Sequence, residues 1–115
     1  NINMNTFNYI NAVFDNLLFR FPTNYEFNES MLMIDDNSTQ ILMGSSGNCK
    51  LDVTTIICNS DEFYEGLVNW SYITLLGREA NSTERDKLMN DLIINSDYQK
   101  IQRSIMSSDE YAHFD

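Results

Sequence analysis

The feature that most constrains this chain is a short motif that occurs twice. Residues 17–23 read Leu-Leu-Phe-Arg-Phe-Pro-Thr and residues 75–81 read Leu-Leu-Gly-Arg-Glu-Ala-Asn, and a glutamate, Glu26 or Glu84, follows each of them three residues later. A second pair of similar segments, 60–63 and 108–111, contains Asp61-Glu62 and Asp109-Glu110. Internal repetition of this kind predicts one structural unit used twice, and it is more typical of frameworks and surfaces than of active sites.

The repeats divide the chain into a first copy at about residues 6–63 and a second at about 64–115, which we expect to form a single domain. Arg20 and Asp61 are 41 positions apart, whereas Arg78 and Asp109 are 31 apart, so the first copy holds ten extra residues. They fall in the irregular stretch 35–50. Insertions collect where the backbone is exposed, so we expect this loop on the surface.

Apolar spacing predicts an all-α fold of five to six helices, with the two related units packed as one bundle. Helices are expected at residues 6–21, from Thr23, at 51–58, at 60–77, from Asn81 and from Ser96. Capping boxes are expected at Thr23/Glu26, Asn59/Glu62, Asn81/Glu84 and Ser96/Gln99. The β-branched run at 53–57 also fits a strand, and residues 40–43 could form one helical turn. The aromatic residues expected in the core are Phe7, Phe14, Trp70 and Tyr72.

Residues 72–80, Tyr-Ile-Thr-Leu-Leu-Gly-Arg-Glu-Ala, followed by Glu84 and by residues 105–111, carry a family resemblance. They resemble a bacterial domain of unknown function marked by Leu-Gly-Arg-Glu-Pro and a closing Ser-x-Glu-Tyr. That domain occurs in surface-layer, adhesin-like and other secreted proteins and is akin to phycobilisome linker domains. The resemblance is clearest over residues 64–114. The first copy departs from the motif at Phe19 and Phe21, and Ala80 stands where the family often has proline.

The resemblance implies a non-catalytic helical module in an extracellular or periplasmic assembly, whose partners are other protein subunits or domains. It supplies no catalytic residue. Because the chain begins at Asn1 and the repeats fill it, we expect a piece of a larger protein.

The net charge of −10 disfavours binding to nucleic-acid phosphates and to anionic membranes. No stretch reaches the roughly 18 apolar residues of a membrane span.

Arg20 and Arg78 are the sharpest candidate positions. Each could bind a carboxylate of a partner, or could tie its helix end to Asp61/Glu62 or Asp109/Glu110, and we favour the second interpretation. The four glutamates at residues 26, 62, 84 and 110 could be read as paired acids for hydrolysis. Their helix-cap positions explain them without chemistry, so no catalytic residue is predicted.

The remaining candidates are weaker. Cys49 and Cys58 could form a disulfide if Cys49 lies in a loop, but nine helical steps would separate them by roughly 13 Å. Asp35, Asn37 and Thr39 resemble the start of a calcium loop, but the glycine and the closing glutamate are missing. His113, the only histidine, is expected at the surface, and no cofactor is predicted.

The preferred functional hypothesis is a structural or protein-interaction module. The first alternative is a binding module that recognises a glycan or a peptide through the loop at 35–50. A second alternative is an accessory subunit of a larger enzyme or respiratory complex.

Overall fold

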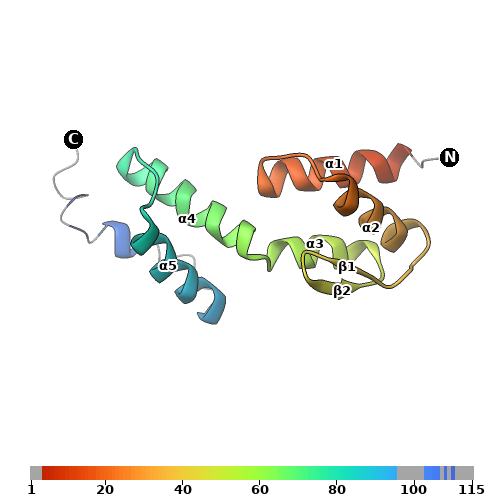
Figure 1. Cartoon of the computed structure of the whole chain (residues 1–115). Helices are drawn as coiled ribbons and strands as arrows, with labels where there is room; N and C mark the ends of the chain where they lie inside the picture. Colours follow the sequence, from red (N-terminus) through yellow and green to blue (C-terminus); the bar gives the residue numbers. More distant parts are fainter. Residues whose placement is uncertain (1–3, 96–102, 107, 109, 111–115) are drawn as a thin grey trace. The chain divides into compact units, whose positions relative to one another are not determined.

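The structure, a computed structural model, describes residues 4–95, 103–106, 108 and 110, and within them it is mostly helical. Its elements in chain order are α1 (Met4–Leu18), α2 (Asn24–Asp35), β1 (Gln40–Leu42), β2 (Ser45–Gly47), α3 (Lys50–Cys58), α4 (Asp61–Leu76) and α5 (Ser82–Asn95) (Figure 1). Residues 103–106 form a further helical segment. The prediction of an all-α fold is therefore confirmed. None of the helices in the described ranges is both long and apolar enough to span a membrane.

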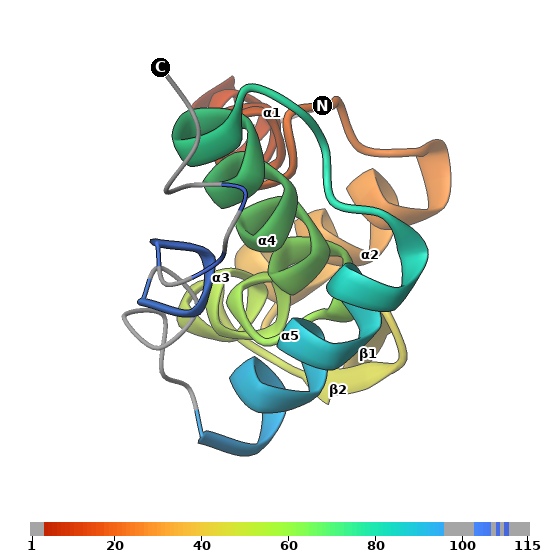
Figure 2. The same cartoon turned by 90° about the vertical axis from the view of Figure 1, so that its left-hand side faces the viewer.

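The chain divides into two compact units, residues 1–63 and residues 64–115. In the first unit, α1, α2 and α3 pack around one apolar core, and the hairpin β1–β2 lies against α2 and α3 (Figures 1 and 2). The buried residues of this core are Ile10, Phe14, Leu18, Met33, Leu42, Val53, Ile56 and Ile57. The spacing of three and four along α1 places its apolar stripe on this core, as predicted.

The second unit has a core of its own. Its buried residues are Val68, Tyr72, Leu76, Ala80, Leu88, Leu92 and Ile105. Three of them stand 58 positions after Ile10, Phe14 and Leu18, so corresponding stripes of the two copies face inward. Trp70 and Phe7 were expected in the core, but their side chains are 49% and 38% exposed. The face of α4 that carries Trp70 and Ile73 is half exposed.

The residues between α2 and α3 form a β-hairpin, so the helical turn expected at 40–43 is wrong. Strand β1 pairs antiparallel with β2, with Gln40 opposite Gly47 and Leu42 opposite Ser45. The two turn residues, Met43 and Gly44, both have positive φ, 50° and 83°. A two-residue turn with both central residues in this region matches the right-handed twist of paired strands, and it keeps Leu42 fully buried.

Two helix boundaries follow the sequence signals closely. Thr23 accepts a hydrogen bond from the Glu26 backbone and the Glu26 side chain accepts one from Thr23, so the capping box is confirmed. Asn81 and Glu84 make the same reciprocal pair at 2.9 and 3.0 Å. The β-branched run at 53–57 is helical, because α3 buries Val53, Ile56 and Ile57 on one side. The cap expected at Ser96 lies outside the described residues.

The capping box expected at Asn59 is wrong in its first member. The side chain that caps α4 is Ser60, whose Oγ accepts from the Phe63 backbone N–H at 3.2 Å and donates to the Ile57 carbonyl at 2.7 Å. The Asn59 side chain instead donates to the Thr55 carbonyl within α3. One hydroxyl therefore satisfies both the end of α3 and the start of α4.

Gly47 places the hairpin against the helices. A Cβ at this position would lie 2.6 Å from Met33 Cε, 2.7 Å from Asp52 Cβ and 3.0 Å from Ile56 Cδ1. Such distances are too short for carbon atoms, so strand β2 can approach α2 and α3 only if it has no side chain here.

We predict opposite effects for two glycine-to-alanine substitutions. Gly47→Ala should lower the free energy of unfolding by about 1–3 kcal/mol because the added methyl overpacks the core. Gly66→Ala should raise it by about 0.5–1 kcal/mol, because Gly66 lies inside α4 with no atom near the new methyl group. Chemical denaturation followed by circular dichroism measures both. A destabilising Gly66→Ala or a neutral Gly47→Ala would contradict the packing described here.

Candidate functional site

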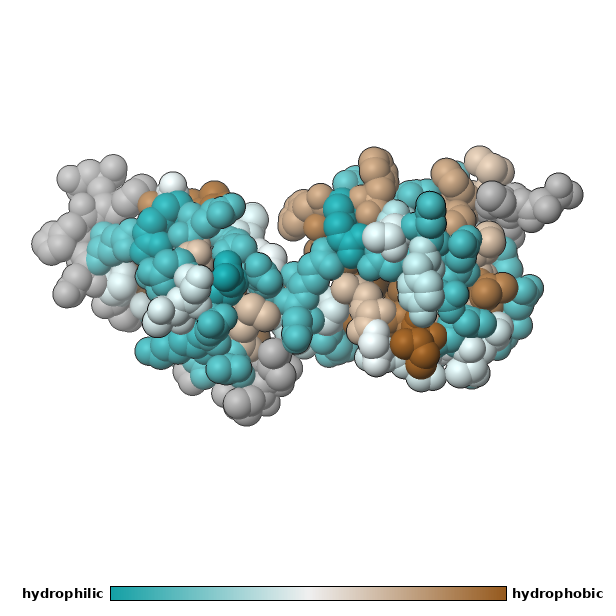
Figure 3. Space-filling view, in the orientation of Figure 1, coloured by the Kyte–Doolittle hydropathy of each residue, from teal (hydrophilic) through white to brown (hydrophobic). Residues whose placement is uncertain are grey.

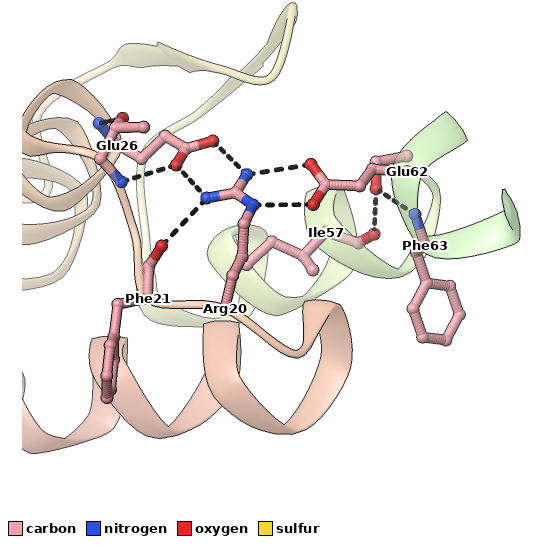
Figure 4. A network of polar contacts seen from close by, with 8 residues as sticks. Arg20, Phe21, Glu26, Ile57, Glu62 and Phe63 are labelled. Atoms are coloured by element: carbon pink, nitrogen blue, oxygen red, sulfur yellow. Dashed lines mark hydrogen bonds and ion pairs between the residues drawn. The ribbon is translucent and has the colours of Figure 1, made fainter. Parts of the chain in front are cut away.

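The first candidate site is built at the connection between α1 and α2. The backbone of Phe19 turns into the left-handed region with φ 57°, and its N–H still donates to the Asp15 carbonyl at 3.0 Å. Pro22 and the cap at Thr23 then start α2. This short turn places Arg20 beside Glu26 in the first turn of α2, and α4 supplies Glu62 from its own first turn (Figure 4).

All five N–H donors of the Arg20 guanidinium are engaged. Nη1 and Nη2 donate to the two carboxylate oxygens of Glu26 at 2.7 and 2.9 Å. Nε and Nη2 donate to Glu62 at 2.7 and 2.9 Å, and Nη1 also donates to the Phe21 carbonyl at 3.1 Å. We call Arg20, Glu26 and Glu62 the first clamp. Because guanidinium has five donors, this arrangement leaves none for a further ligand.

The second unit contains the same arrangement, the second clamp, made of Arg78, Glu84 and Glu110. Arg78 donates two bonds to Glu84 at 2.9 and 3.0 Å and two to Glu110 at 2.7 and 2.5 Å. Its fifth bond goes to the carbonyl of Glu79, which stands 58 positions after Phe21. The donors and acceptors correspond atom by atom between the two clamps.

Each guanidinium also lies over an aromatic ring of its own unit. Arg20 Cζ is 5.6 Å from the centroid of Phe14, and Arg78 Cζ is 5.3 Å from that of Tyr72. A cation over the face of an aromatic ring is attracted by the ring quadrupole. The clamps therefore join the polar helix ends to the apolar cores beneath them.

In each unit a serine side chain makes the same hydrogen bond to the preceding helical turn. Ser60 and Ser108 each donate from Oγ to the carbonyl of the isoleucine three residues earlier, Ile57 or Ile105. Both isoleucines are buried. The glutamate of each clamp follows its serine by two residues. The serine contact therefore helps to position Glu62 beside Arg20 and Glu110 beside Arg78.

The clamps shift the titration of their members. Hydrogen bonds from Arg20 hold the pKa of Glu26 below its ordinary value, and those from Arg78 do the same for Glu84 and Glu110. The carboxylates in turn raise the pKa of both arginines. All three shifted glutamates are therefore ionised at neutral pH, and none of them is poised to donate or accept a proton there.

The structure brings together six of the eight motif residues that the sequence singled out. Asp61 is outside the first clamp, with an exposed side chain that makes no hydrogen bond or ion pair to the described residues. Asp109 is outside the described residues, as is His113. The sequence assigned Glu26 and Glu84 to helix capping alone and missed their pairing with arginine. The repeated spacing could have indicated this pairing, because both glutamates follow their arginine by six positions.

The other candidates do not form sites. Cys49 and Cys58 are free thiols at the two ends of α3, so the disulfide considered from the sequence is not formed, and burial raises the pKa of Cys58. Asp35 accepts a hydrogen bond from Thr6, and Asn37 donates to the Asn48 carbonyl. Over the described ranges, no three His, Cys, Asp or Glu side chains gather as metal ligands.

A polar pocket of about 330 Å³ lies in the first unit, beside the hairpin. It is lined by Met43, Ser45, Ile56, Asn59, Ser60, Asp61 and Glu62. One wall belongs to the hairpin and the other to the corner between α3 and α4. The hairpin lies within the residues that the second copy lacks, so the insertion builds one side of this pocket.

No protein-family model matches the chain, and neither the curated proteins nor the solved structures contain a match to it. The family resemblance of residues 72–80 and 105–111 therefore stays a prediction.

We predict that both clamps stabilise the fold. Arg20→Met should lower the free energy of unfolding by about 2 kcal/mol, because five hydrogen bonds are lost and the Glu26 carboxylate, 13% exposed, keeps no cation. Arg78→Met should lower it by less, because the second clamp is more exposed.

The matched control for these variants is Lys87→Met, which removes one positive charge from an exposed side chain. It should stay within about 0.5 kcal/mol of the parent. Thermal unfolding followed by circular dichroism compares all three, and fluorescence of the single tryptophan, Trp70, reports on the second unit. Equal melting temperatures for Arg20→Met and Lys87→Met would refute a stabilising role.

We predict that stability falls in acid. Because Glu26, Glu84 and Glu110 titrate below their ordinary 4.5, the unfolded chain binds more protons than the folded one in this range. Their contribution is complete above the unfolded value and is lost as the pH drops through it towards the folded values. Denaturation midpoints between about pH 6 and pH 3 should decrease, and less steeply in the Arg20→Met, Arg78→Met double variant. Parallel curves would show that the clamps carry none of this dependence.

Proposed function

We propose that this chain is a non-catalytic structural or protein-interaction module of a larger extracellular or periplasmic bacterial assembly. The observation that carries the proposal is that all five donors of Arg20 and of Arg78 are bonded within their own unit, four to two glutamates and one to a backbone carbonyl. Within the described residues, the arginines and glutamates of the two clamps thus connect helix ends to one another. The extracellular or periplasmic setting rests on the sequence resemblance alone.

Exposed apolar side chains support an interaction role. In the first unit, Met4, Phe19, Phe21, Tyr25, Ile41 and Leu51 are each at least half exposed. Figure 3 shows apolar side chains, coloured tan to brown, at the surface of this unit. Exposed apolar side chains of this kind are typical of surfaces that contact another protein.

The test is affinity purification from the native source, with the tagged chain as bait at near-physiological salt. We expect a protein partner to be retained in a fixed ratio to the bait. An enzyme or a respiratory complex as the partner would indicate the accessory-subunit alternative. A bait that stays monomeric and retains nothing would contradict the proposal.

The pocket beside the hairpin favours a second candidate function, a peptide-binding module. The carboxylate of Asp61 makes no hydrogen bond or ion pair within the part of the chain that the structure describes, Ser45 adds a hydroxyl, and Met43 and Ile56 give an apolar surface. This combination suits a lysine or arginine side chain, with its aliphatic part on the apolar residues and its charge on the Asp61 carboxylate. A neutral glycan has no positive charge to pair with the Asp61 carboxylate.

We predict that Asp61→Asn weakens binding of a short lysine-containing peptide at least about threefold, because one charge-assisted contact is lost. The control variant is Asp86→Asn, which makes the same change at an exposed position in α5. The control ligand is the same peptide with its lysine acetylated. Nuclear magnetic resonance titration compares them. Equal responses to both peptides, or equal losses in both variants, would exclude a specific pocket.

A further inference from the structure

Two phenylalanines project from the connection between α1 and α2. Phe19 and Phe21 stand on either side of Arg20, and their side chains are 73% and 70% exposed. The ring of Phe21 points away from the guanidinium, and only its carbonyl takes part in the first clamp (Figure 4). These rings therefore bury little apolar surface within the first unit.

Phe19 also carries backbone strain. Its φ of 57° lies in the left-handed region, which disfavours a side chain with a Cβ and favours glycine. At the corresponding position of the second unit the residue is Gly77, with φ 70° and the same helix-ending hydrogen bond, from its N–H to the Ile73 carbonyl at 2.9 Å. The turn thus forms well with glycine, so the fold does not require an aromatic residue here.

The second exposed ring is equally unnecessary for the turn. Glu79 replaces Phe21 in the second unit, and its carbonyl accepts the same bond from the arginine. The first unit therefore has two exposed aromatic rings, one of them on a strained backbone, where the second unit builds the same clamp without them. Backbone strain that the fold does not require is typical of residues that take part in binding.

The surroundings of the two rings are acidic. The first clamp carries one positive and two negative groups, and Asp15, whose carbonyl ends α1 at Phe19, adds an exposed carboxylate. The whole chain has a net charge of −10. A surface that complements this turn must offer an apolar groove for the rings and positive charge around it.

We propose that Phe19 and Phe21 anchor the chain in an apolar groove of a partner protein whose rim carries lysine or arginine. This inference rests on the proposed interaction function and names the surface that serves it. The aromatic rings supply the buried contact, and Asp15 together with the clamp carboxylates faces the basic rim. The second unit, with Gly77 and Glu79, lacks this anchor.

The test is site-specific photo-crosslinking with the full chain. Phe21→p-benzoylphenylalanine is incubated with extract of the native source, and the matched control places the same group at Leu51, which is 71% exposed on α3. We expect a crosslink from position 21 and not from position 51. The crosslinked protein should have an apolar site flanked by lysine or arginine, and the yield should fall as salt rises.

Phe19→Gly separates binding from folding. It should raise the melting temperature by about 3 °C, because glycine relieves the strain, while it lowers the crosslinking yield about tenfold. Asp15→Asn should lower the yield about threefold and leave the melting temperature unchanged. A lower melting temperature for Phe19→Gly would show that the ring serves the fold and would overturn the proposal.

Binding partners other than a protein with a basic groove would give different results in this experiment. A crosslink to a second copy of the chain, a salt-independent crosslink to an acidic protein, or binding to phosphatidylcholine vesicles that requires Phe21 would each refute a basic partner groove. If affinity purification retains a partner but crosslinks arise equally from position 51, this inference fails and the proposed function stands. If nothing is retained by the bait, both fail.

Discussion

The structure depends on a guanidinium whose five donors are all used inside its own unit. Arg20 joins the end of α1, the start of α2 and the start of α4 through Glu26 and Glu62. No other side chain could do this, because lysine has a single charged nitrogen and cannot form two bidentate pairs. The aromatic ring beneath, Phe14, links this polar junction to the apolar core. Removing Arg20 would leave the carboxylates of Glu26 and Glu62 without their cation, whereas removing one glutamate would leave Arg20 paired with the other.

Helix α4 takes part in both units. Glu62, in its first turn, completes the first clamp, and Val68, Tyr72 and Leu76 further along belong to the second core. The serine contact at Ser60 fixes where the helix begins. The first unit differs from the second by the hairpin, which needs Gly47 for its close approach and contributes to the pocket. The repeated elements thus serve stability, and the features found only in the first unit are the candidates for recognition.

Sequence reasoning predicted the described helices and two of their starts, because those signals are local. Apolar spacing and the reciprocal caps at Thr23 and Asn81 each act within a few residues. It failed at residues 40–43, where a short apolar run fits a helical turn as well as a strand and only the pairing with β2 decides. It also misplaced Trp70 and Phe7, since spacing shows that a face is apolar but not whether anything covers it. That the two units pack as one bundle stays a prediction.

For the candidate site, the sequence by itself singled out the residue types: two arginines, a capping glutamate six positions after each, and a Ser-Asp-Glu segment in each copy. It did not show that the capping glutamates pair with the arginines. Only the tertiary structure decided that Glu62 rather than Asp61 reaches Arg20, and that the guanidinium is saturated. It alone showed Phe19 as a strained, exposed ring and the hairpin as the wall of a pocket. The physical reason is that capping and periodicity act between neighbours in the chain. The pairing of Arg20 with Glu62 joins residues 42 positions apart and depends on how three helices meet.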